Sequence, residues 1–363
     1  MRMVHVLGSL DVGGAELRLL DLCRELREED AEQVFVLLAG RRGAIADRFE
    51  ALGATVQRCD LHPIPTFPRR LYATFCRLRP DAVVAHVALV SGLVLTVARA
   101  ARVRTRIAWF RSDGDGREET AARRAVRAVL RLLLRTSATS VVAVSPAALR
   151  FGIARPERWR RGIAEVIPNG VDTARFAPVE RAAARQALGI AADALVLLHL
   201  GRAAPEKNRA FLIEVLAEMR AGGAAPILLL AGPGGTDDVT IPHPGAATDA
   251  GVVFLGARDD VPTLLGAADA LLLPSVREGM PGALLEALAC GVPVVSNDLP
   301  GPREIARVLP GVELVDLALG PGVWASAVKR AIADHPPPEA LHQAVAGSPY
   351  ALASAARVWR AMW

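Results

Sequence analysis

Apolar residues cluster in short runs along the whole chain, and stretches with helical spacing separate these runs. The runs are rich in valine, leucine and isoleucine and show little polar alternation, as expected of strands buried on both faces of a parallel sheet. We predict strands at residues 4–10, 33–39, 55–59, 81–86, 106–110, 140–145, 164–168, 194–201, 226–232, 252–256, 270–274 and 292–296. This alternation predicts an α/β protein with two Rossmann-like, doubly wound parallel-sheet domains.

Turn-forming residues separate the two predicted sheets. The sequence Pro168-Asn169-Gly170 favours a turn after the last strand of the first sheet, and a new helix is expected near Pro178. We therefore predict one domain over residues 1–168 and a second over residues 169–349. The tail, residues 350–363, predicts a final amphipathic helix.

Composition narrows the range of partners. The chain of 363 residues is 52% hydrophobic and carries a net charge of +5, almost entirely from arginine, because Lys207 and Lys329 are its only lysines. A mild positive charge favours anionic ligands such as phosphates, or contact with a membrane surface, although biased amino-acid usage explains it equally well. The low aromatic content of 4% and the lack of a stacking motif argue against nucleic acid as a partner.

The cysteines and the apolar runs indicate the compartment. The four cysteines have no CxxC pairing, which argues against a disulfide framework or a zinc site and is typical of a reducing cytosol. The chain opens on a strand pattern and not on a signal-peptide pattern. The uncharged run 82–98 resembles a strand that turns into a helix more than a membrane span. We expect a cytoplasmic protein, with peripheral contact at the inner face of the membrane as an option.

The loops after the predicted strands are the places to look for chemistry, because open parallel sheets bind ligands at the carboxyl ends of their strands. After the first strand, Gly13 and Gly14 open a helix, which is either a phosphate-approaching turn or a plain connection. After the first strand of the second sheet, Gly201 precedes Arg202 and Lys207, two cations that suit a diphosphate. The Gly-rich stretch 231–235 lacks the lysine of a P-loop and is interpreted as structural.

The segment VREGMPGALLEALACGVPVVS, residues 276–296, keeps two carboxylates in an otherwise apolar run. A helix is expected from Pro281 or Gly282 to Gly291. Glu278 precedes this helix, and Glu286 lies one turn after small residues that leave room for a ligand. Carboxylates accept hydrogen bonds from sugar hydroxyls, and a helix N-terminus favours phosphate. The segment therefore predicts a site for a sugar joined to a diphosphate.

The nine residues from Glu278 to Glu286, EGMPGALLE, resemble the E-x7-E motif of family-4 retaining glycosyltransferases. Five further segments resemble that family's signatures in the right order: GSLDVGGAE, IPNGVDTARF, GRAAPEKN, LLLAGPGG and FLGARDDVPTLLGAADALLLPS. The likeness is most specific over residues 164–306 and thinner over 40–160. It implies a GT-B fold, in which two Rossmann-like domains face a cleft and the C-terminal helix crosses back to the N-terminal domain.

The resemblance also implies an activity and a set of residues. The expected reaction is transfer of a sugar from a nucleoside-diphosphate sugar, with UDP favoured, to the hydroxyl of a lipid, polysaccharide or small metabolite, without a metal or other cofactor. Catalytic roles fall to Arg202, Lys207, Glu278 and His86, although a lone histidine is more often structural. Donor-binding roles fall to Gly13, Gly14, Gly201, Leu255, Arg258, Gly279, Met280, Pro281, Gly282, Leu284, Leu285 and Glu286.

Two segments of the first half each allow two interpretations. Asp113-Gly114-Asp115 is a DxD triplet, which binds a metal in another glycosyltransferase architecture. Here we expect Arg111 and Asp113 to contribute to acceptor recognition instead. The arginine-rich stretch 117–135 predicts an amphipathic helix with a charged outer face, and an anionic membrane surface is the alternative.

Other reactions fit the sequence less well. A nucleotide-sugar 2-epimerase of the same fold and a non-catalytic nucleotide-sugar-binding protein are the two alternatives, and the intact Arg202, Lys207, Glu278 and Glu286 argue against the second. A pyridoxal-phosphate phosphorylase requires a Schiff-base lysine, and the chain has few to offer.

Overall fold

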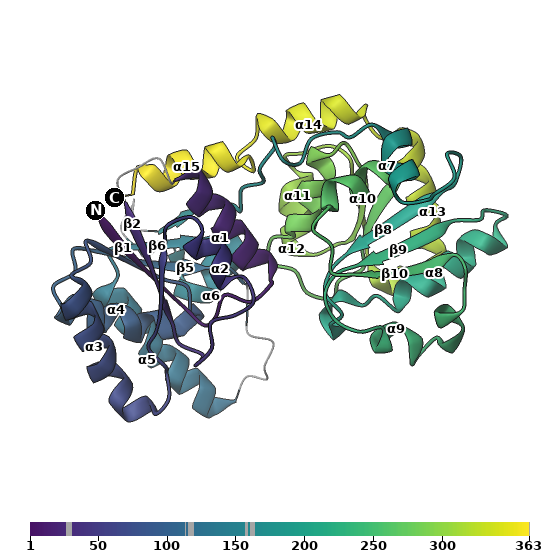
Figure 1. Ribbon diagram of the computed structural model, residues 1–363. Helices are drawn as coiled ribbons and strands as arrows, with labels where there is room; N and C mark the ends of the chain where they lie inside the picture. Colours follow the sequence, from purple (N-terminus) through teal and green to yellow (C-terminus); the bar gives the residue numbers. More distant parts are fainter. Residues whose placement is uncertain (27–30, 113, 115–119, 157–158, 160–163, 363) are drawn as a thin grey trace. The chain divides into compact units, whose positions relative to one another are not determined.

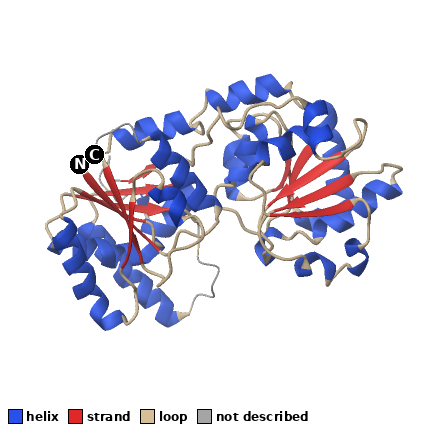
Figure 2. Cartoon of the chain, in the orientation of Figure 1, coloured by secondary structure: helices blue, strands red, loops and turns tan. Residues whose placement is uncertain are grey.

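The computed structural model describes residues 1–26, 31–112, 114, 120–156, 159 and 164–362. The chain forms two compact units. Unit 1 contains Met1–Gly170 together with Leu352–Trp363, and unit 2 contains Val171–Ala351. The sequence-based boundary was set at 168/169, with the tail assigned from residue 350. Each unit has a sheet covered by helices on both faces (Figures 1 and 2).

The sheet of unit 1 is entirely parallel and has the strand order β3-β2-β1-β4-β5-β6-β7. This is the order of a doubly wound Rossmann fold, extended by one strand. The strands are β1 (Arg2–Leu7), β2 (Glu32–Leu37), β3 (Thr55–Arg58), β4 (Ala82–Ala85), β5 (Thr105–Phe110), β6 (Ser140–Ala143) and β7 (Ala164–Val166).

Helices cover both faces of this sheet, because right-handed crossovers on either side of β1 run over opposite faces. One layer contains α3, α4 and α5, and α1 packs with α2 and α15 on the other side (Figure 1). The helices of unit 1 are α1 (Gly14–Glu25), α2 (Ala46–Glu50), α3 (Phe67–Leu78), α4 (Ser91–Ala100), α5 (Ala121–Ser137), α6 (Pro146–Ile153) and α15 (Leu352–Arg360).

Unit 2 repeats the architecture with six parallel strands in the order β10-β9-β8-β11-β12-β13. The strands are β8 (Val196–Leu200), β9 (Ile227–Ala231), β10 (Val252–Gly256), β11 (Ala270–Leu273), β12 (Val294–Asn297) and β13 (Val312–Val315). The helices are α7 (Arg181–Ala187), α8 (Phe211–Ala221), α9 (Asp237–Thr240), α10 (Val261–Ala267), α11 (Gly282–Ala289), α12 (Pro300–Ala306), α13 (Pro321–Asp334) and α14 (Pro338–Ala346). On one face, Trp324 and Val328 of α13 join Val215 of α8 in a core against the sheet.

The structure confirms the predicted fold class and every predicted strand, with ends that shift by a few residues. Strand β13 was not predicted, because its four residues VELV include a glutamate and therefore resemble an exposed loop. The helix expected near Pro178 begins at Arg181, where the Glu180 side chain accepts from the Ala182 and Ala183 N–H groups. The run 82–98 is a strand and a helix, as predicted. Within the described residues, no helix is long and apolar enough to span a bilayer.

The C-terminal helix returns to unit 1, as the predicted fold requires. Helix α15 packs against α1, and Trp359 is buried with its ring centroid 4.4 Å from that of Trp109. The approach is close, because a Cβ on Gly170 would lie 2.5 Å from the Leu352 Cα. A glycine is therefore required where the chain leaves unit 1 for the first time.

Candidate active site

The predicted site residues of unit 2 gather where the strand order of its sheet reverses. Strand β8 has β9 on one side and β11 on the other, so the loops after β8 and β11 leave the sheet in opposite directions. The β8 loop contains Gly201 and Arg202 and leads into a short 3₁₀ turn, Pro205–Lys207. The β11 loop contains Glu278. Because the two strands are parallel neighbours, both loops start at the same carboxyl-terminal end of the sheet and lie next to each other there.

Lys207 and Glu278 are in direct contact across this point. The Lys207 ammonium donates to Oε1 of Glu278, and the Ser275 hydroxyl donates to the same oxygen at 2.9 Å. The lysine and glutamate side chains are only 20% and 12% exposed, so the pair is largely shielded from water. The other carboxylate oxygen of Glu278 receives neither of these hydrogen bonds. The structure therefore brings together a cation and a carboxylate that sequence analysis assigned to separate parts of one ligand.

Arg202 lies further out, with 57% of its side chain exposed, and forms an ion pair with Glu206. The pKa of Glu206 is lowered by a hydrogen bond from its own backbone N–H, and further by Arg202, Arg277 and Lys207. Arg202, Arg277 and Lys207, from the β8 and β11 loops, therefore lie around the carboxylate of Glu206. An incoming anion can pair with these cations if Arg202 turns away from Glu206.

Close packing explains the glycines of this site. A Cβ on Gly201 would lie 2.8 Å from Nε2 of His199 and 3.4 Å from Cδ of Lys207. His199 is fully buried, its Nδ1 lies 2.9 Å from the Leu272 carbonyl oxygen, and burial lowers its pKa to about 4. Gly232 has φ +148°, and an added Cβ would overlap the carbonyl oxygen of Gly201. The Gly-rich stretch 231–235 therefore packs closely against the β8 loop. This agrees with the expectation that the stretch has a structural role.

Helix α11 begins directly after the β11 loop, residues 274–281, which we call the acidic loop. Pro281 is its N-cap residue, and no side chain in the described part of the chain caps it. The N–H groups of Gly282, Ala283 and Leu284 therefore have no acceptor within the helix. The first N–H group that α-helical geometry pairs is that of Leu285, with the carbonyl of Pro281. The side chains of Leu284 and Leu285 are buried, so only main-chain atoms of these two can meet a ligand.

The other donor-binding candidates surround this helix start. Glu286 is partly buried within α11, and Gly279 precedes the helix with Met280. A Cβ on Gly301, at the start of α12, would overlap the Gly279 carbonyl oxygen, so α12 supports the acidic loop from behind. Leu255 lies near the end of β10, and Arg258 follows it and forms an ion pair with Asp260 at 2.5 Å.

Unit 1 shows the same arrangement at its own strand-order reversal, between β1 and β4. Gly13 is the N-cap of α1, no side chain of the described residues caps it, and Gly14 is the first residue of the helix. A Cβ on Gly14 would meet no atom of the described residues within 4 Å, so their packing does not require a glycine at this position. The space beside Gly14 is compatible with a ligand that approaches the backbone.

His86 follows β4 and belongs to a packed polar cluster. Its Nε2 lies 3.0 Å from Nδ1 of His5, and its ring lies 5.1 Å from that of Trp109. Burial, and secondly the charge of Arg111, lowers the pKa of His5 to about 3 and that of His86 well below its usual value. Both imidazoles are therefore neutral at pH 7. His86 Nδ1 and His5 Nε2 have no hydrogen-bond partner among the described residues.

Arg111 completes this cluster after β5. Its Nη1 donates to the Ala15 carbonyl oxygen at 2.6 Å, and its guanidinium carbon lies 4.2 Å from the Trp109 ring centroid. Burial lowers the pKa of Arg111 to about 10, which leaves it charged at neutral pH. Its Nε and Nη2 have no acceptor in the described part of the chain. Asp113 and Asp115 lie outside the described residues.

Three polar side chains of the unit 2 site were not predicted, nor was His5 in the cluster of unit 1. Ser275 bonds to Glu278, and the Asn297 amide at the end of β12 donates to the Ser275 carbonyl oxygen at 2.9 Å and so anchors the acidic loop. His199 lies beneath Gly201. The positions of Ser275 and Asn297 at strand ends are a usable signal, whereas His199 lies inside a strand, where the sequence provides none.

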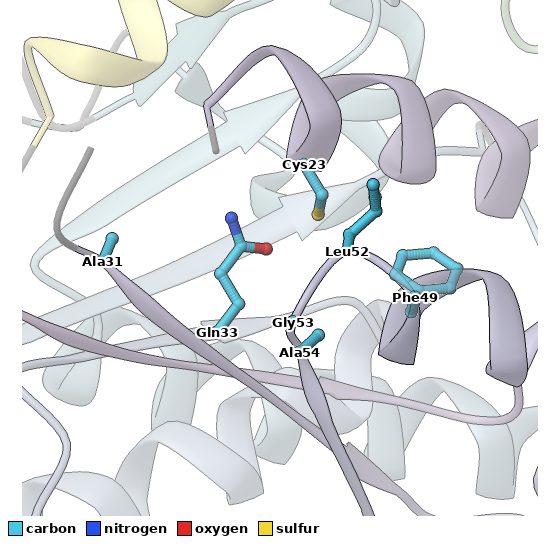
Figure 3. A pocket seen from close by; sticks show the side chains of 7 residues that line it. All are labelled: Cys23, Ala31, Gln33, Phe49, Leu52, Gly53 and Ala54. Carbon is cyan, nitrogen blue, oxygen red and sulfur yellow. The ribbon is translucent and has the colours of Figure 1, made fainter. Parts of the chain in front are cut away.

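A small pocket lies apart from the predicted site residues. A pocket of about 70 Å³ in unit 1 is lined by Cys23, Ala31, Gln33, Phe49, Leu52, Gly53 and Ala54 (Figure 3). It contains none of the predicted site residues, and burial raises the pKa of the Cys23 thiol to about 12, which makes it a poor nucleophile. Across the described ranges, no three His, Cys, Asp or Glu side chains are grouped as metal ligands.

Two glycosyltransferase family models match the chain, one in each unit. Residues 13–170 match the family model described as "Glycosyl transferase 4-like domain", and residues 194–334 match the one described as "Glycosyl transferases group 1". The "Putative glycosyltransferase EpsF" of Bacillus subtilis is 29% identical over 345 residues, which is 92% of this chain and 88% of that protein. The "Capsular polysaccharide biosynthesis glycosyltransferase CapH" of Staphylococcus aureus is 25% identical, with 92% and 91% covered.

Solved structures show the same architecture. HepE from Anabaena in complex with UDP has a TM-score of 0.82 at 21% identity, with 99% of both chains covered. The complex of HepE with UDP-glucose has a TM-score of 0.78 at 22% identity, with 99% of this chain and 98% of the other covered. With a glycosyltransferase family model matching each of its two Rossmann-like units in turn, the protein is a glycosyltransferase of the GT-B fold, similar to family 4, and an enzyme of the EC 2.4 class.

Proposed function

We propose that this enzyme transfers a sugar from a nucleoside-diphosphate sugar to an acceptor hydroxyl, with retention of configuration at the anomeric carbon. The observation that carries the proposal is the Lys207–Glu278 contact beside the uncapped start of α11. It joins a cation, a carboxylate and free N–H groups at the strand-order reversal of unit 2. These groups complement the diphosphate and the hydroxyls of one donor molecule.

The donor assignments follow from this chemistry. Lys207 and Arg202 bind the diphosphate together with the N–H groups of Gly282 to Leu284. Glu278, oriented by Ser275, accepts from a hydroxyl of the transferred sugar, and Glu286 accepts from the ribose hydroxyls. The base lies near Leu255 and Arg258. In unit 1, we propose that Gly13 and Gly14 contribute to donor binding through their backbone N–H groups. We favour UDP as the nucleotide, which is supported by HepE, a protein of the same fold that was solved with UDP and with UDP-glucose.

The reaction needs stabilisation of a leaving diphosphate more than it needs a nucleophile. The bond from the anomeric carbon to the diphosphate oxygen breaks, and a bond to the acceptor oxygen forms on the same face. The acceptor proton passes to the departing phosphate oxygen. Lys207 and Arg202 stabilise the developing negative charge, which is commonly the largest catalytic contribution. Because these cations supply the charge, we propose that no metal is required and that activity persists in excess chelator.

The acceptor is proposed to bind at the polar cluster of unit 1. Arg111 keeps two guanidinium N–H groups without acceptors in the described part of the chain, and His86 keeps one ring nitrogen. A neutral His86 suits contact with hydroxyl groups, and Arg111 suits an anionic group of the acceptor. Lipid, polysaccharide and small-metabolite acceptors all remain candidates. The name of CapH, which refers to capsular polysaccharide biosynthesis, supports a polysaccharide precursor.

The test has two parts. First, a panel of nucleotide sugars and free nucleoside diphosphates is screened by thermal shift, because a ligand of the folded state raises Tm. We expect UDP and UDP-sugars to give the largest shifts, and an unchanged Tm across the panel would refute donor binding. Second, the best donor is incubated without acceptor. Formation of a 2-epimeric sugar there would identify an epimerase and contradict the proposed transfer.

A further inference from the structure

Helix α5 presents an apolar stripe to solvent in addition to the exposed arginines that its sequence predicts. Its inner side is marked by Leu134 and Ser137, both buried. The contact with α4 is so close that a Cβ on Gly92 would overlap the Leu130 carbonyl oxygen. At 100° per residue, Val129 and Leu132 lie about 140° and 160° around the axis from Leu134. The side of α5 opposite the core is therefore aliphatic.

The exposure of these side chains is large. Val126, Val129 and Leu132 are 58%, 57% and 60% exposed, and Ala125 and Ala128 beside them are exposed as well. The three large residues recur at three-residue spacing, so they form one continuous stripe along the helix. We call Val126, Val129 and Leu132 the α5 stripe. A stripe of this kind on a surface helix indicates an interaction site.

A row of arginines runs beside the α5 stripe. Arg124, Arg127, Arg131 and Arg135 recur at three- or four-residue spacing, and α5 contains no acidic residue. Two of them hold the helix in place: Arg131 donates to the Phe151 carbonyl oxygen at 2.8 Å, and the Arg127 guanidinium carbon lies 5.7 Å from the Phe151 ring centroid. Arg124 and Arg135 are exposed. The sequence 117–137 contains six arginines against two glutamates.

Another helix of the same layer, which packs on α4, adds to this charge. Helices α3, α4 and α5 pack in one layer on the same face of the sheet (Figure 1). Helix α3 also has no acidic residue, and its Arg69 and Arg77 are exposed together with Tyr72. The α5 stripe is thus part of a cationic surface, and its occupant must offer both negative charge and apolar depth.

We propose that the α5 stripe and its arginine row bind the interface of an anionic lipid bilayer. The stripe enters the boundary between headgroups and acyl chains, and the guanidinium groups of Arg124 and Arg135 pair with lipid phosphates. A nucleic acid satisfies the arginines and leaves the stripe in water, whereas an apolar protein partner leaves the arginines unpaired. The bilayer interface satisfies both. This binding is independent of the nucleotide sugar.

The test measures co-sedimentation of the full-length protein with vesicles of phosphatidylcholine, with and without phosphatidylglycerol. We expect binding only with phosphatidylglycerol, weakened by salt. The double variant Val129→Glu/Leu132→Glu should reduce the partition coefficient by roughly tenfold or more, because apolar burial is lost and two negative charges are added. Ile241→Glu in unit 2, at a residue that is 75% exposed, is the matched control and should bind like the unmodified protein.

A second pair of variants isolates the charge. Arg124→Glu/Arg135→Glu should weaken binding to phosphatidylglycerol vesicles by about fivefold or more per position, and Arg307→Glu, an exposed arginine of unit 2, should not. Thermal unfolding and UDP binding check that each variant is folded. Three results would each overturn the proposal. The first is equal binding to neutral vesicles, and the second is unchanged vesicle binding of the Val129→Glu/Leu132→Glu variant. The third is binding to heparin that is as tight as binding to vesicles and is unchanged in that variant.

Discussion

Lys207 and Glu278 lie 71 residues apart in the sequence and form an ion pair in the structure. They meet because β8 and β11 are neighbours in a parallel sheet whose strand order reverses between them. The pair is largely shielded from water, and a serine and an asparagine fix the loop that carries the glutamate. A donor that binds here enters a site whose cation and carboxylate already have fixed positions, which reduces the ordering cost of binding.

Removal of either cation of the donor site should slow catalysis strongly. Lys207→Ala and Arg202→Ala are each expected to lower kcat by about a hundredfold to a thousandfold, because charge at the leaving diphosphate is no longer compensated. Steady-state kinetics with the best donor measure the effect. Arg307→Ala, at an exposed arginine in the same unit, should retain normal rates. Wild-type-like kcat in both site variants would refute the diphosphate assignment.

Glu286 should act on nucleotide affinity more than on rate. Glu286→Ala is expected to weaken UDP binding by about tenfold to a hundredfold, the range for loss of a hydrogen bond to a charged group. Titration calorimetry with free UDP measures this directly. Glu339→Ala, at an exposed glutamate of α14, serves as the control. An unchanged dissociation constant for Glu286→Ala would remove the ribose assignment without affecting that of Lys207.

The glycines after β9 should differ in their tolerance of alanine. Gly232→Ala forces a side chain into the Gly201 carbonyl oxygen at a positive φ, and we expect a loss of about 1–3 kcal/mol in the free energy of unfolding. Gly235 has nothing within 4 Å of an added Cβ, so Gly235→Ala should stay within about 0.5 kcal/mol of the original. Denaturant unfolding of both variants makes the comparison. Equal effects would mean that the β8 loop does not depend on this close approach.

His199 should make unit 2 sensitive to mild acid. Its pKa is lowered to about 4 in the folded state, chiefly by burial, whereas the unfolded chain has the ordinary value of 6.5. Between these values the unfolded state binds more protons, so stability is full above pH 6.5 and falls as the pH drops towards 4. From pH 7.5 to 5.5 this costs about 1 kcal/mol. His199→Asn should remove that part of the pH dependence in denaturant unfolding, and an unchanged slope would contradict it.

The strands could be predicted from sequence because each is a short apolar run that must be buried on both faces. Strand β13 was missed because Glu313 interrupts such a run and pairs with Arg330 on the surface at 2.6 Å. The helix α11 was predicted within a residue or so, since Pro281 and Gly291 mark its two ends. The outer face of α5 was predicted only in part: Arg124 and Arg135 are exposed as expected, but so are Val126, Val129 and Leu132, because periodicity does not show which aliphatic residues the core covers.

For the candidate site residues, too, some features could be predicted from sequence and others could not. The loops that hold Arg202, Lys207, Glu278 and His86 could be found because each follows a predicted strand. The contacts within them could not. Ser275 and Asn297 act through hydrogen bonds between separate strands, and His5 meets His86 only because β1 and β4 are paired.

The sequence by itself determined the two α/β units, the loops that carry polar groups and the resemblance to family-4 glycosyltransferases, because hydrophobic periodicity and turn chemistry are local properties of the chain. The tertiary structure alone decided that Lys207 bonds to Glu278, that two histidines and an arginine share a cluster in unit 1, and that the α5 stripe faces solvent. Those outcomes depend on strand order and helix packing, which arise from contacts between residues distant in sequence, and no local pattern encodes them.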